Sequence, residues 1–185
     1  MAIFASGSGS NAENIINYFQ DDPNIAVSSI YTNNPKAGVI ERAERLNIPS
    51  FLFSKNRLGE QTFVDDLRNN HDYLILAGFL LLVPPNLIKR FPNRIINLHP
   101  SLLPKFGGKG MYGMNVHEAV IAAGERHSGI TIHLVNEEYD KGKHLFQAQL
   151  DISKSDTPEN LATNIHQLEY QHFPKVIADY INGAG

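Results

Sequence analysis

Two patterns of apolar and polar residues alternate along the chain. Short, nearly continuous apolar runs predict strands, and apolar residues spaced three or four positions apart predict helices. Short runs of Ile, Leu, Val, Phe and Ala have the length of buried strands. They cover residues 2–6, 26–31, 50–53, 73–78 and 94–99. Stretches with the helical spacing of apolar residues lie between or beside them. They cover residues 11–20, 37–46, 60–69 and 84–91. This alternation is typical of successive β-α-β units.

The pattern changes in the last part of the chain. A helix is predicted over residues 115–125, and two β-patterned strands follow at 129–135 and 144–152. A terminal helix is predicted over residues 155–181, with Pro158 in its first turn, where a missing N–H does no harm.

These elements predict an α/β fold in a single domain over residues 1–185. We expect a Rossmann-like, mostly parallel sheet flanked by helices on both faces, with an antiparallel edge contributed by residues 129–152. With a mass of 20.6 kDa, the chain is long enough to bury about two-thirds of its unfolded surface. We find no internal repeat, low-complexity segment or linker that would separate domains.

The composition excludes several classes of function. A formal net charge of -3 gives no general attraction for nucleic acid or anionic lipid. The longest apolar stretch, residues 73–85, is too short for a membrane helix, which needs about 20 residues. We therefore expect small-molecule substrates, with no nucleic-acid and no membrane partner.

The cysteine count narrows the chemistry further. With zero cysteines, the chain has no disulfide, thiolate zinc site or cysteine nucleophile, and it suits a reducing compartment such as the cytoplasm. A homodimer is compatible with the sequence, which does not decide the oligomeric state.

Ligands of open parallel sheets bind beyond the carboxyl ends of the strands. Because the net charge does not attract an anion in general, an anionic ligand has to be bound locally in one of these places. The segments that directly follow predicted strands are residues 6–11, 79–83, 97–101 and 136–142.

The first of these segments contains the loop from Gly7 to Asn11, in the sequence ASGSGSNAEN. Glycines let the backbone approach a ligand, and the following helix presents N–H groups at its N-terminus, so the loop suits a phosphate. The spacing also satisfies a relaxed dinucleotide fingerprint, but the second strand ends in IYTNN without the acidic residue that this motif needs. A structural alternative is a capping box, in which Ser10 caps the helix and Glu13 reaches back.

The segment NLHPSLLPK places Asn97 and His99 on one face of a strand, with prolines restricting the chain behind them. An amide and an imidazole on one face can stabilise a developing oxyanion and exchange a proton. Asp140 follows another strand, and a carboxylate near an imidazole favours the imidazolium. The candidate catalytic set is therefore Asn97, His99 and Asp140. The structural alternative is a satisfied histidine at a strand end beside a turn-forming asparagine.

Metal binding is an alternative role for the eight histidines of the chain. The sequence contains neither H-x-x-x-H nor H-E-x-x-H and no cysteine pair, so we expect no metal. His117 in a helix and His133 in a strand are interpreted as packing or hydrogen-bonding residues. No G-x-S-x-G nucleophile elbow is present either.

Four segments together resemble the phosphoribosylglycinamide formyltransferase family, folate-dependent enzymes of purine synthesis. These segments are FASGSGSN, LAGFLLLVPP, INLHPSLLPKF and YDKGK. The likeness extends from the first strand into the terminal helix. HPSLLPK is shared by the wider formyltransferase superfamily, whereas the glycine loop and the short length select this family.

The resemblance implies a reaction and roles for the candidate residues. The amine of phosphoribosylglycinamide would attack the formyl carbon of the co-substrate 10-formyltetrahydrofolate, giving the formylated amide and tetrahydrofolate. Asn97 and His99 would stabilise the tetrahedral oxyanion, and His99 would also donate the proton. Asp140 would keep this histidine protonated.

The resemblance also implies binding residues, which fall into three groups. The residues for the substrate phosphate are Gly9, Ser10 and Asn11. Glu169 would contact the glycinamide end of the substrate. The residues for the folate are Leu80, Leu81, Leu82 and Val83, which read the pterin largely through their backbone, together with Asn97.

Other functions remain open alternatives. Methionyl-tRNA formyltransferase and formyltetrahydrofolate deformylase share the HPSLLP region, but each has a further domain that does not fit in 185 residues. The absence of a basic patch also argues against tRNA. A non-catalytic phosphate- or nucleotide-binding module would use only the 6–11 loop, and it would need neither Asn97 nor Asp140.

Overall fold

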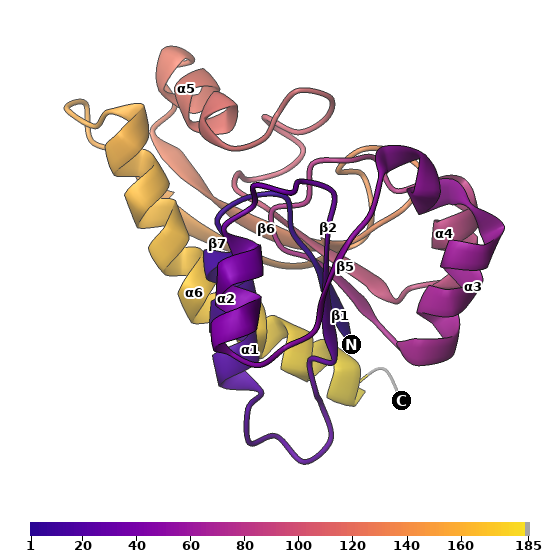
Figure 1. Ribbon diagram of the computed structural model, residues 1–185. Coiled ribbons are helices and arrows are strands. Elements are labelled where there is room, and N and C mark those ends of the chain that lie inside the picture. The colour runs from indigo at the N-terminus through magenta and orange to yellow at the C-terminus, as the bar shows by residue number, and fades with distance from the viewer. Residues whose placement is uncertain (184–185) are drawn as a thin grey trace. The chain divides into compact units, whose positions relative to one another are not determined.

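The computed structural model describes residues 1–183 of the chain (Figure 1). Within this part, seven strands are hydrogen-bonded in the order β3-β2-β1-β4-β5-β6-β7. The expected fold class, a mostly parallel sheet with helices and an antiparallel edge, is confirmed. The chain forms two compact units, the first ending at Asn97 and the second beginning at Leu98. The expected single domain stays a prediction.

The first unit contains parallel strands and the helices that connect them. Its strands are β1 (Ala2–Phe4), β2 (Ser29–Thr32), β3 (Ser50–Leu52), β4 (Leu74–Leu76) and the beginning of β5 (Ile95–His99). Its helices are α1 (Ser10–Tyr18), α2 (Val39–Arg45), α3 (Gln61–Asn70) and α4 (Pro85–Arg90), with a short 3-10 helix η1 (Lys55–Gly59) that the sequence did not predict. Every strand and helix predicted for this region is present.

The central strands of the first unit are covered on both faces of the sheet, whereas the edge strand β3 is exposed. All residues of β1 and β4 are buried, as expected for parallel strands with helices on either side. The chain steps from β1 to β2 to β3 and then returns past β1 to β4. With right-handed crossovers, this reversal puts α1 and α2 on one face and α3 and α4 on the other, as Figure 1 shows. The reversal point lies beside β1, where the glycine loop begins.

The second unit is a hairpin of two long strands with two helices. Its elements are α5 (Met114–Ala122), β6 (His127–Leu134), β7 (His144–Asp151) and α6 (Pro158–Gly183). The antiparallel pairing places Thr131 opposite Gln147 and Gly129 opposite Gln149. β6 is buried from Ser128 onward, whereas β7 contains only exposed and half-buried residues.

Helix α6 covers this hairpin and packs against α5. It begins at Pro158, later than the predicted start at residue 155 but with the proline in its first turn as expected. It buries Leu161, Ile165, Phe173 and Ile177 at helical spacing. Although α6 has 26 residues, neither it nor any other helix within residues 1–183 is apolar enough to cross a membrane.

Candidate active site

The end of β5 carries Asn97 and His99. Asn97 is half-buried, and His99 is buried, with 4% of its surface exposed. Side chains alternate along a strand, so these two point to the same face. The strand ends at His99 because Pro100 has no N–H to continue the hydrogen-bond ladder.

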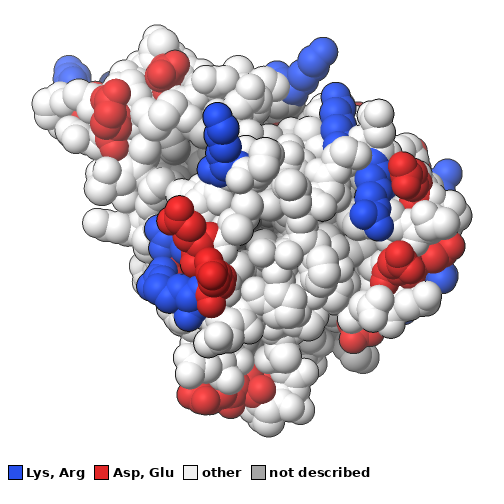
Figure 2. Space-filling model, viewed as in Figure 1, with Lys and Arg blue, Asp and Glu red and all other residues white. Residues whose placement is uncertain are grey.

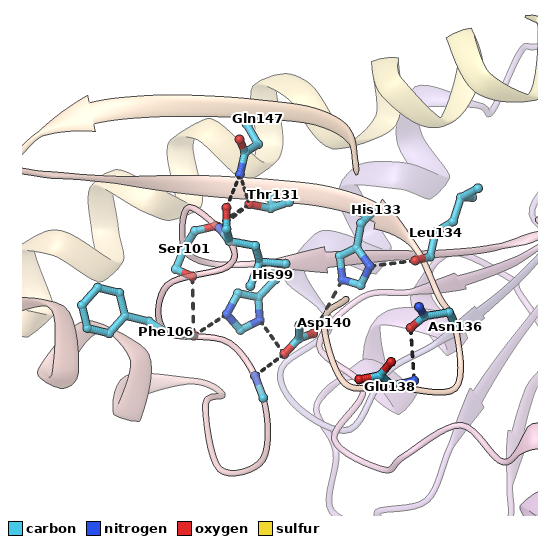
Figure 3. Close-up of polar contacts among 12 residues, drawn as sticks. His99, Ser101, Phe106, Thr131, His133, Leu134, Asn136, Glu138, Asp140 and Gln147 are labelled. Atoms are coloured by element: carbon cyan, nitrogen blue, oxygen red, sulfur yellow. Dashed lines mark hydrogen bonds and ion pairs between the residues drawn. The ribbon is translucent and has the colours of Figure 1, made fainter. Parts of the chain in front are cut away.

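Two acceptor groups hold the imidazole of His99 from opposite edges (Figure 3). Nε2 lies 2.7 Å from the carbonyl oxygen of Phe106, and Nδ1 lies 3.6 Å from Oδ2 of Asp140. A carbonyl can only accept, so Nε2 carries the proton in this contact. The separation of 3.6 Å exceeds a hydrogen bond, so Nδ1 forms an ion pair with Asp140 when the ring is protonated and keeps its capacity to donate to a ligand.

Asp140 lies in the loop after β6, and only 12% of its side chain is exposed. Its Oδ2 accepts a 2.8 Å hydrogen bond from the N–H of Gly108, and its Oδ1 lies 3.6 Å from Nε2 of His133. One carboxylate therefore faces two buried histidines, His99 and His133, and is anchored by a backbone donor. The structure brings His99 and Asp140 together, as the sequence predicted.

The pKa values of the pair follow from burial and from these neighbours. Burial lowers the pKa of His99 below its ordinary value, while Asp140 and the Phe106 carbonyl act in the opposite direction. For Asp140, burial alone would raise the pKa of the carboxyl, but His133, His99 and the Gly108 N–H together lower it. Asp140 thus favours the imidazolium in the expected direction. The burial makes that imidazolium a stronger acid than an ordinary histidine.

His133 was missed as a site residue. It lies on β6, is 2% exposed, and places Nδ1 2.8 Å from the carbonyl of Leu134, so that Nε2 faces Asp140. The interpretation as a hydrogen-bonding strand residue was correct but did not connect it to Asp140. The only available signal was its position on a strand that leads into the loop of Asp140.

The glycine loop connects β1 to α1 in the first unit. Gly9 precedes the helix with a left-handed φ of 79°, and a Cβ there would lie 2.6 Å from Cα of Val39. Ser10 is the first residue of α1, so the loop delivers the chain to a helix N-terminus, as expected for a phosphate site.

The capping-box alternative for this loop is wrong. Gly9, not Ser10, occupies the cap position, and no side chain caps the helix. The carboxylate of Glu13 turns away to pair with Arg42, and with Nη2 of Arg45 at 2.7 Å. Nε of Arg42 in turn donates to the Ser8 carbonyl at 2.9 Å. Over α1 and α2, acidic and basic side chains consequently lie side by side on the surface (Figure 2).

The predicted folate segment follows β4 and lies beside the glycine loop. The hydroxyl of Ser6 accepts from the N–H of Leu80 at 3.2 Å, and the N–H of Ser6 donates to the Gly78 carbonyl at 3.0 Å. Leu80 and Leu82 are 48% and 47% exposed, whereas Val83 is buried. Ser6 was not singled out from the sequence, although it holds the two predicted segments of this unit together.

Glu169 lies on α6 and is 4% exposed, which is unusual for a carboxylate. Its Oε2 lies 3.8 Å from Nε2 of His166, one helical turn earlier.

On α5, His117 is 3% exposed, and its Nδ1 has no hydrogen-bond partner within residues 1–183. Burial, with the charges of His166 and His99, lowers the pKa of His117 to about 4. His117 is therefore neutral at pH 7 and buried, and of its two interpretations, packing or hydrogen bonding, the structure favours packing.

The described residues divide the predicted site into groups. The second unit brings together His99 and Asp140, and the strand β5 adds Asn97. The first unit brings together the loop of Gly9, Ser10 and Asn11 and the segment from Leu80 to Val83. Within residues 1–183, no three His, Cys, Asp or Glu side chains cluster in a way that could hold a metal ion.

Comparison with known sequences gives matches along nearly the whole chain. The family model for formyl transferase matches residues 1–177. A chloroplastic phosphoribosylglycinamide formyltransferase of Arabidopsis thaliana is 42% identical over 96% of this chain and 63% of the relative. The enzyme of the same name from Bacillus subtilis is 38% identical over 95% of this chain and 91% of the relative. The chain spans only about three fifths of its plant relatives, 63% and 59% of their lengths.

Solved structures agree with these matches. The crystal structure of phosphoribosylglycinamide formyltransferase from Bacillus halodurans has a TM-score of 0.88 and 34% identity, covering 100% of this chain and 96% of that one. The enzyme from Streptococcus pneumoniae has a TM-score of 0.86 and 32% identity, covering 97% of both chains. The family match over residues 1–177, the identity with the relatives and the similar fold have one explanation: the chain belongs to the formyl transferase family.

Proposed function

We propose that the protein is a phosphoribosylglycinamide formyltransferase, which transfers the formyl group of 10-formyltetrahydrofolate to the amine of phosphoribosylglycinamide in purine synthesis. The observation that carries the proposal is the buried pair of His99 and Asp140 beyond Asn97 on β5, in a chain of the formyl transferase family. Relatives named for this activity support the choice of substrates.

The proposed reaction uses groups at the end of β5. The amine nitrogen forms a bond to the formyl carbon, and the formyl oxygen takes up negative charge. The amide of Asn97 and Nδ1–H of His99 donate to this oxygen. When the bond from the carbon to folate N10 breaks, N10 receives a proton from His99, and the ring recovers a proton from the attacking amine. The charge of Asp140 stabilises the imidazolium throughout.

The binding roles are part of the same proposal. The N-terminus of α1, with Gly9, Ser10 and Asn11, suits the phosphate of the substrate. The buried carboxylate of Glu169 suits the glycinamide end. The residues proposed for the folate are Leu80, Leu81, Leu82 and Val83, together with Asn97. For the location we propose the cytoplasm, although two plant relatives are named as chloroplastic.

The test is a transfer assay with the purified chain, phosphoribosylglycinamide and 10-formyltetrahydrofolate. Folate absorbance gives the rate, and mass spectrometry identifies the formylated product. Formate release without the amine substrate would instead indicate a deformylase. Formylation of methionyl-tRNA would indicate the tRNA enzyme. A folded protein that binds phosphoribosylglycinamide but performs none of these reactions would favour the phosphate-binding module.

A further inference from the structure

A turn formed by residues 101–106 supplies the carbonyl that holds the His99 ring. Ser101 closes this turn, because its hydroxyl donates to the Lys105 carbonyl at 2.8 Å and lies 3.5 Å from that of Phe106. The Phe106 carbonyl then accepts from Nε2 of His99 at 2.7 Å. The orientation of the ring therefore depends on where the turn is held.

Thr131, on β6, fastens the turn from the other side. Its side chain is fully buried, its hydroxyl donates to the Ser101 carbonyl at 2.6 Å, and its oxygen accepts from the Leu103 N–H at 3.0 Å. The amide of Gln147 donates to the same hydroxyl at 2.9 Å and to the Leu103 carbonyl at 3.1 Å. Figure 3 shows this chain of contacts from Gln147 to His99.

The hydrogen bonds of Thr131 allow one arrangement only. A hydroxyl has one proton and two lone pairs. Here the proton goes to the Ser101 carbonyl, and the lone pairs accept from Leu103 and Gln147. Thr131 and Gln147 are directly opposite each other in the hairpin, so the strand pairing itself fixes their contact.

Packing confirms that the turn lies against β6. Leu103 is buried, with 5% of its surface exposed. A Cβ at Gly129, on the same strand as Thr131, would lie 2.7 Å from Cδ2 of Leu102. The segment after His99 is therefore seated directly on the strand that carries the hydroxyl.

We propose that Thr131, with Gln147 as its cross-strand partner, is a positioning residue for formyl transfer, because it holds the turn whose Phe106 carbonyl orients the His99 ring. The inference rests on the proposed function, since it assigns the ring a catalytic role. Thr131 acts only through the turn and touches no reacting atom.

Replacement of the hydroxyl tests the proposal most directly. Thr131→Val keeps the shape of the side chain but leaves the Ser101 carbonyl and the Leu103 N–H without their partner. We expect kcat to fall by roughly 10- to 100-fold, as for a small misplacement of a reacting group, with KM for both substrates changed by less than about threefold. Thr131→Ser retains the hydroxyl and should keep kcat within about threefold of the unaltered protein.

A pH titration separates positioning from general loss of structure. The groups whose charges reach His99 are Asp140, His133 and His117, and none of them changes in these variants. Because the Phe106 carbonyl favours the imidazolium, loosening it should lower the pKa of His99 and move the alkaline limb of the kcat profile to lower pH.

Nuclear magnetic resonance of the imidazole gives the same shift without any substrate. The His99 signal can be assigned by its loss in His99→Gln. A lowered His99 pKa in Thr131→Val supports the positioning role even if the protein transfers no formyl group, in which case only the proposed function fails. An unchanged titration and an unchanged kcat in Thr131→Val would overturn the inference.

A second pair of variants keeps the test sharp if Thr131→Val does not fold. Gln147→Glu has the same size but presents an acceptor to the Thr131 hydroxyl and the Leu103 carbonyl. Gln149→Glu makes the same change two residues along β7, opposite Gly129. We expect Gln147→Glu to lower kcat about fivefold or more, and Gln149→Glu to have no effect beyond its charge. Equal effects of the two would contradict the inference.

Discussion

The second unit contains a buried histidine–aspartate pair, His99 and Asp140, and an exposed one, His127 and Asp151, and the closer of these two pairs is the less consequential. Nδ1 of His127 lies 2.8 Å from Oδ1 of Asp151 across the hairpin, but the side chains are 51% and 87% exposed. Nδ1 of His99 lies 3.6 Å from Oδ2 of Asp140, with exposures of 5% and 12%. Distance alone would select the exposed pair and not the pair that we propose as catalytic.

The difference shows what makes such a pair useful. Water screens the exposed pair, and surface ion pairs contribute about 0–1 kcal/mol. The buried pair is held by further partners on both members: the Phe106 carbonyl on the ring, and the Gly108 N–H and His133 on the carboxylate. Burial and fixed partners give the ring one orientation and a strong dependence on the carboxylate charge.

The largest difference is expected when the ring is removed from each pair. His99→Gln should lower kcat by roughly 10³-fold, because both the proton donor and a donor to the oxyanion are lost. His127→Gln removes the ring of the exposed pair and should leave kcat within about twofold. Steady-state formyl transfer, with folding checked by circular dichroism, measures both.

A folded His99→Gln variant with normal kcat would refute the mechanism. A loss of similar size in His127→Gln would show that the hairpin as a whole, rather than the buried pair, controls the rate.

Neutralising the carboxylates should have the next largest effect. Asp140→Asn should lower kcat by roughly 10²-fold at pH 8, because without the carboxylate charge the imidazolium is less favoured and the pKa of His99 falls further. The protonated ring is then present only at lower pH, so part of the loss should be recovered on acidification. Asp151→Asn is the matched control and should retain the profile of the unaltered protein. A pH-independent loss in Asp140→Asn would contradict the electrostatic role.

How much of this site the sequence could predict depended on the range of the contacts. Asn97 and His99 share a strand face, and this relation follows from alternation alone. Asp140 was accessible through the rule that ligands bind beyond strand ends. The contacts of His133 with Asp140 and of Thr131 with the turn depend on the register of β6 and on the path of the loop, which periodicity does not fix.

The fold shows the same division. Apolar runs predicted the strands of the first unit and the hairpin of the second, but β3 is exposed at all three residues rather than buried. The short η1 segment has no apolar period and was missed. The glycine loop was located correctly, but its capping box was wrong. Glu13 meets Arg42 and Arg45 on another helix instead, and local sequence does not show such a tertiary ion pair.

His117 is buried like His99, but within residues 1–183 no carboxylate acts to raise the pKa of its ring as Asp140 does for His99, so the effect of burial is not opposed there. Its pKa is about 4 in the folded protein, below the ordinary 6.5, so protonation favours the unfolded chain. Above pH 6.5 His117 is neutral in both the folded and the unfolded protein, and it does not reduce the free energy of unfolding. As the pH falls toward 4, the unfolded chain takes up the proton first, so the free energy of unfolding decreases. The full loss corresponds to about 3 kcal/mol.

Acid unfolding measures this effect. His117→Asn removes the titrating group, so its free energy of unfolding should fall less steeply between pH 6.5 and 4 than that of the unaltered protein. His127→Asn, which removes an exposed ring in the same unit, is the matched control. His71 in the first unit also has a pKa of about 4, so part of the acid sensitivity should persist in His117→Asn. Identical slopes in both variants would contradict this account.

The smallest effect is expected from a methyl group placed behind the buried pair. A Cβ at Gly107 would lie 2.5 Å from Cδ2 of Leu103 and 3.3 Å from Cβ of Asp140. Gly107→Ala should therefore displace the carboxylate of Asp140 by roughly a few tenths of an ångström. We expect kcat to fall by about three- to tenfold, since reacting groups tolerate only small misplacements. Gly59→Ala is the control, because its Cβ would meet Pro84 at an ordinary 3.8 Å. If Gly107→Ala behaves like this control, the position of Asp140 is less critical than its fixed partners imply, and charge alone would explain its effect on His99.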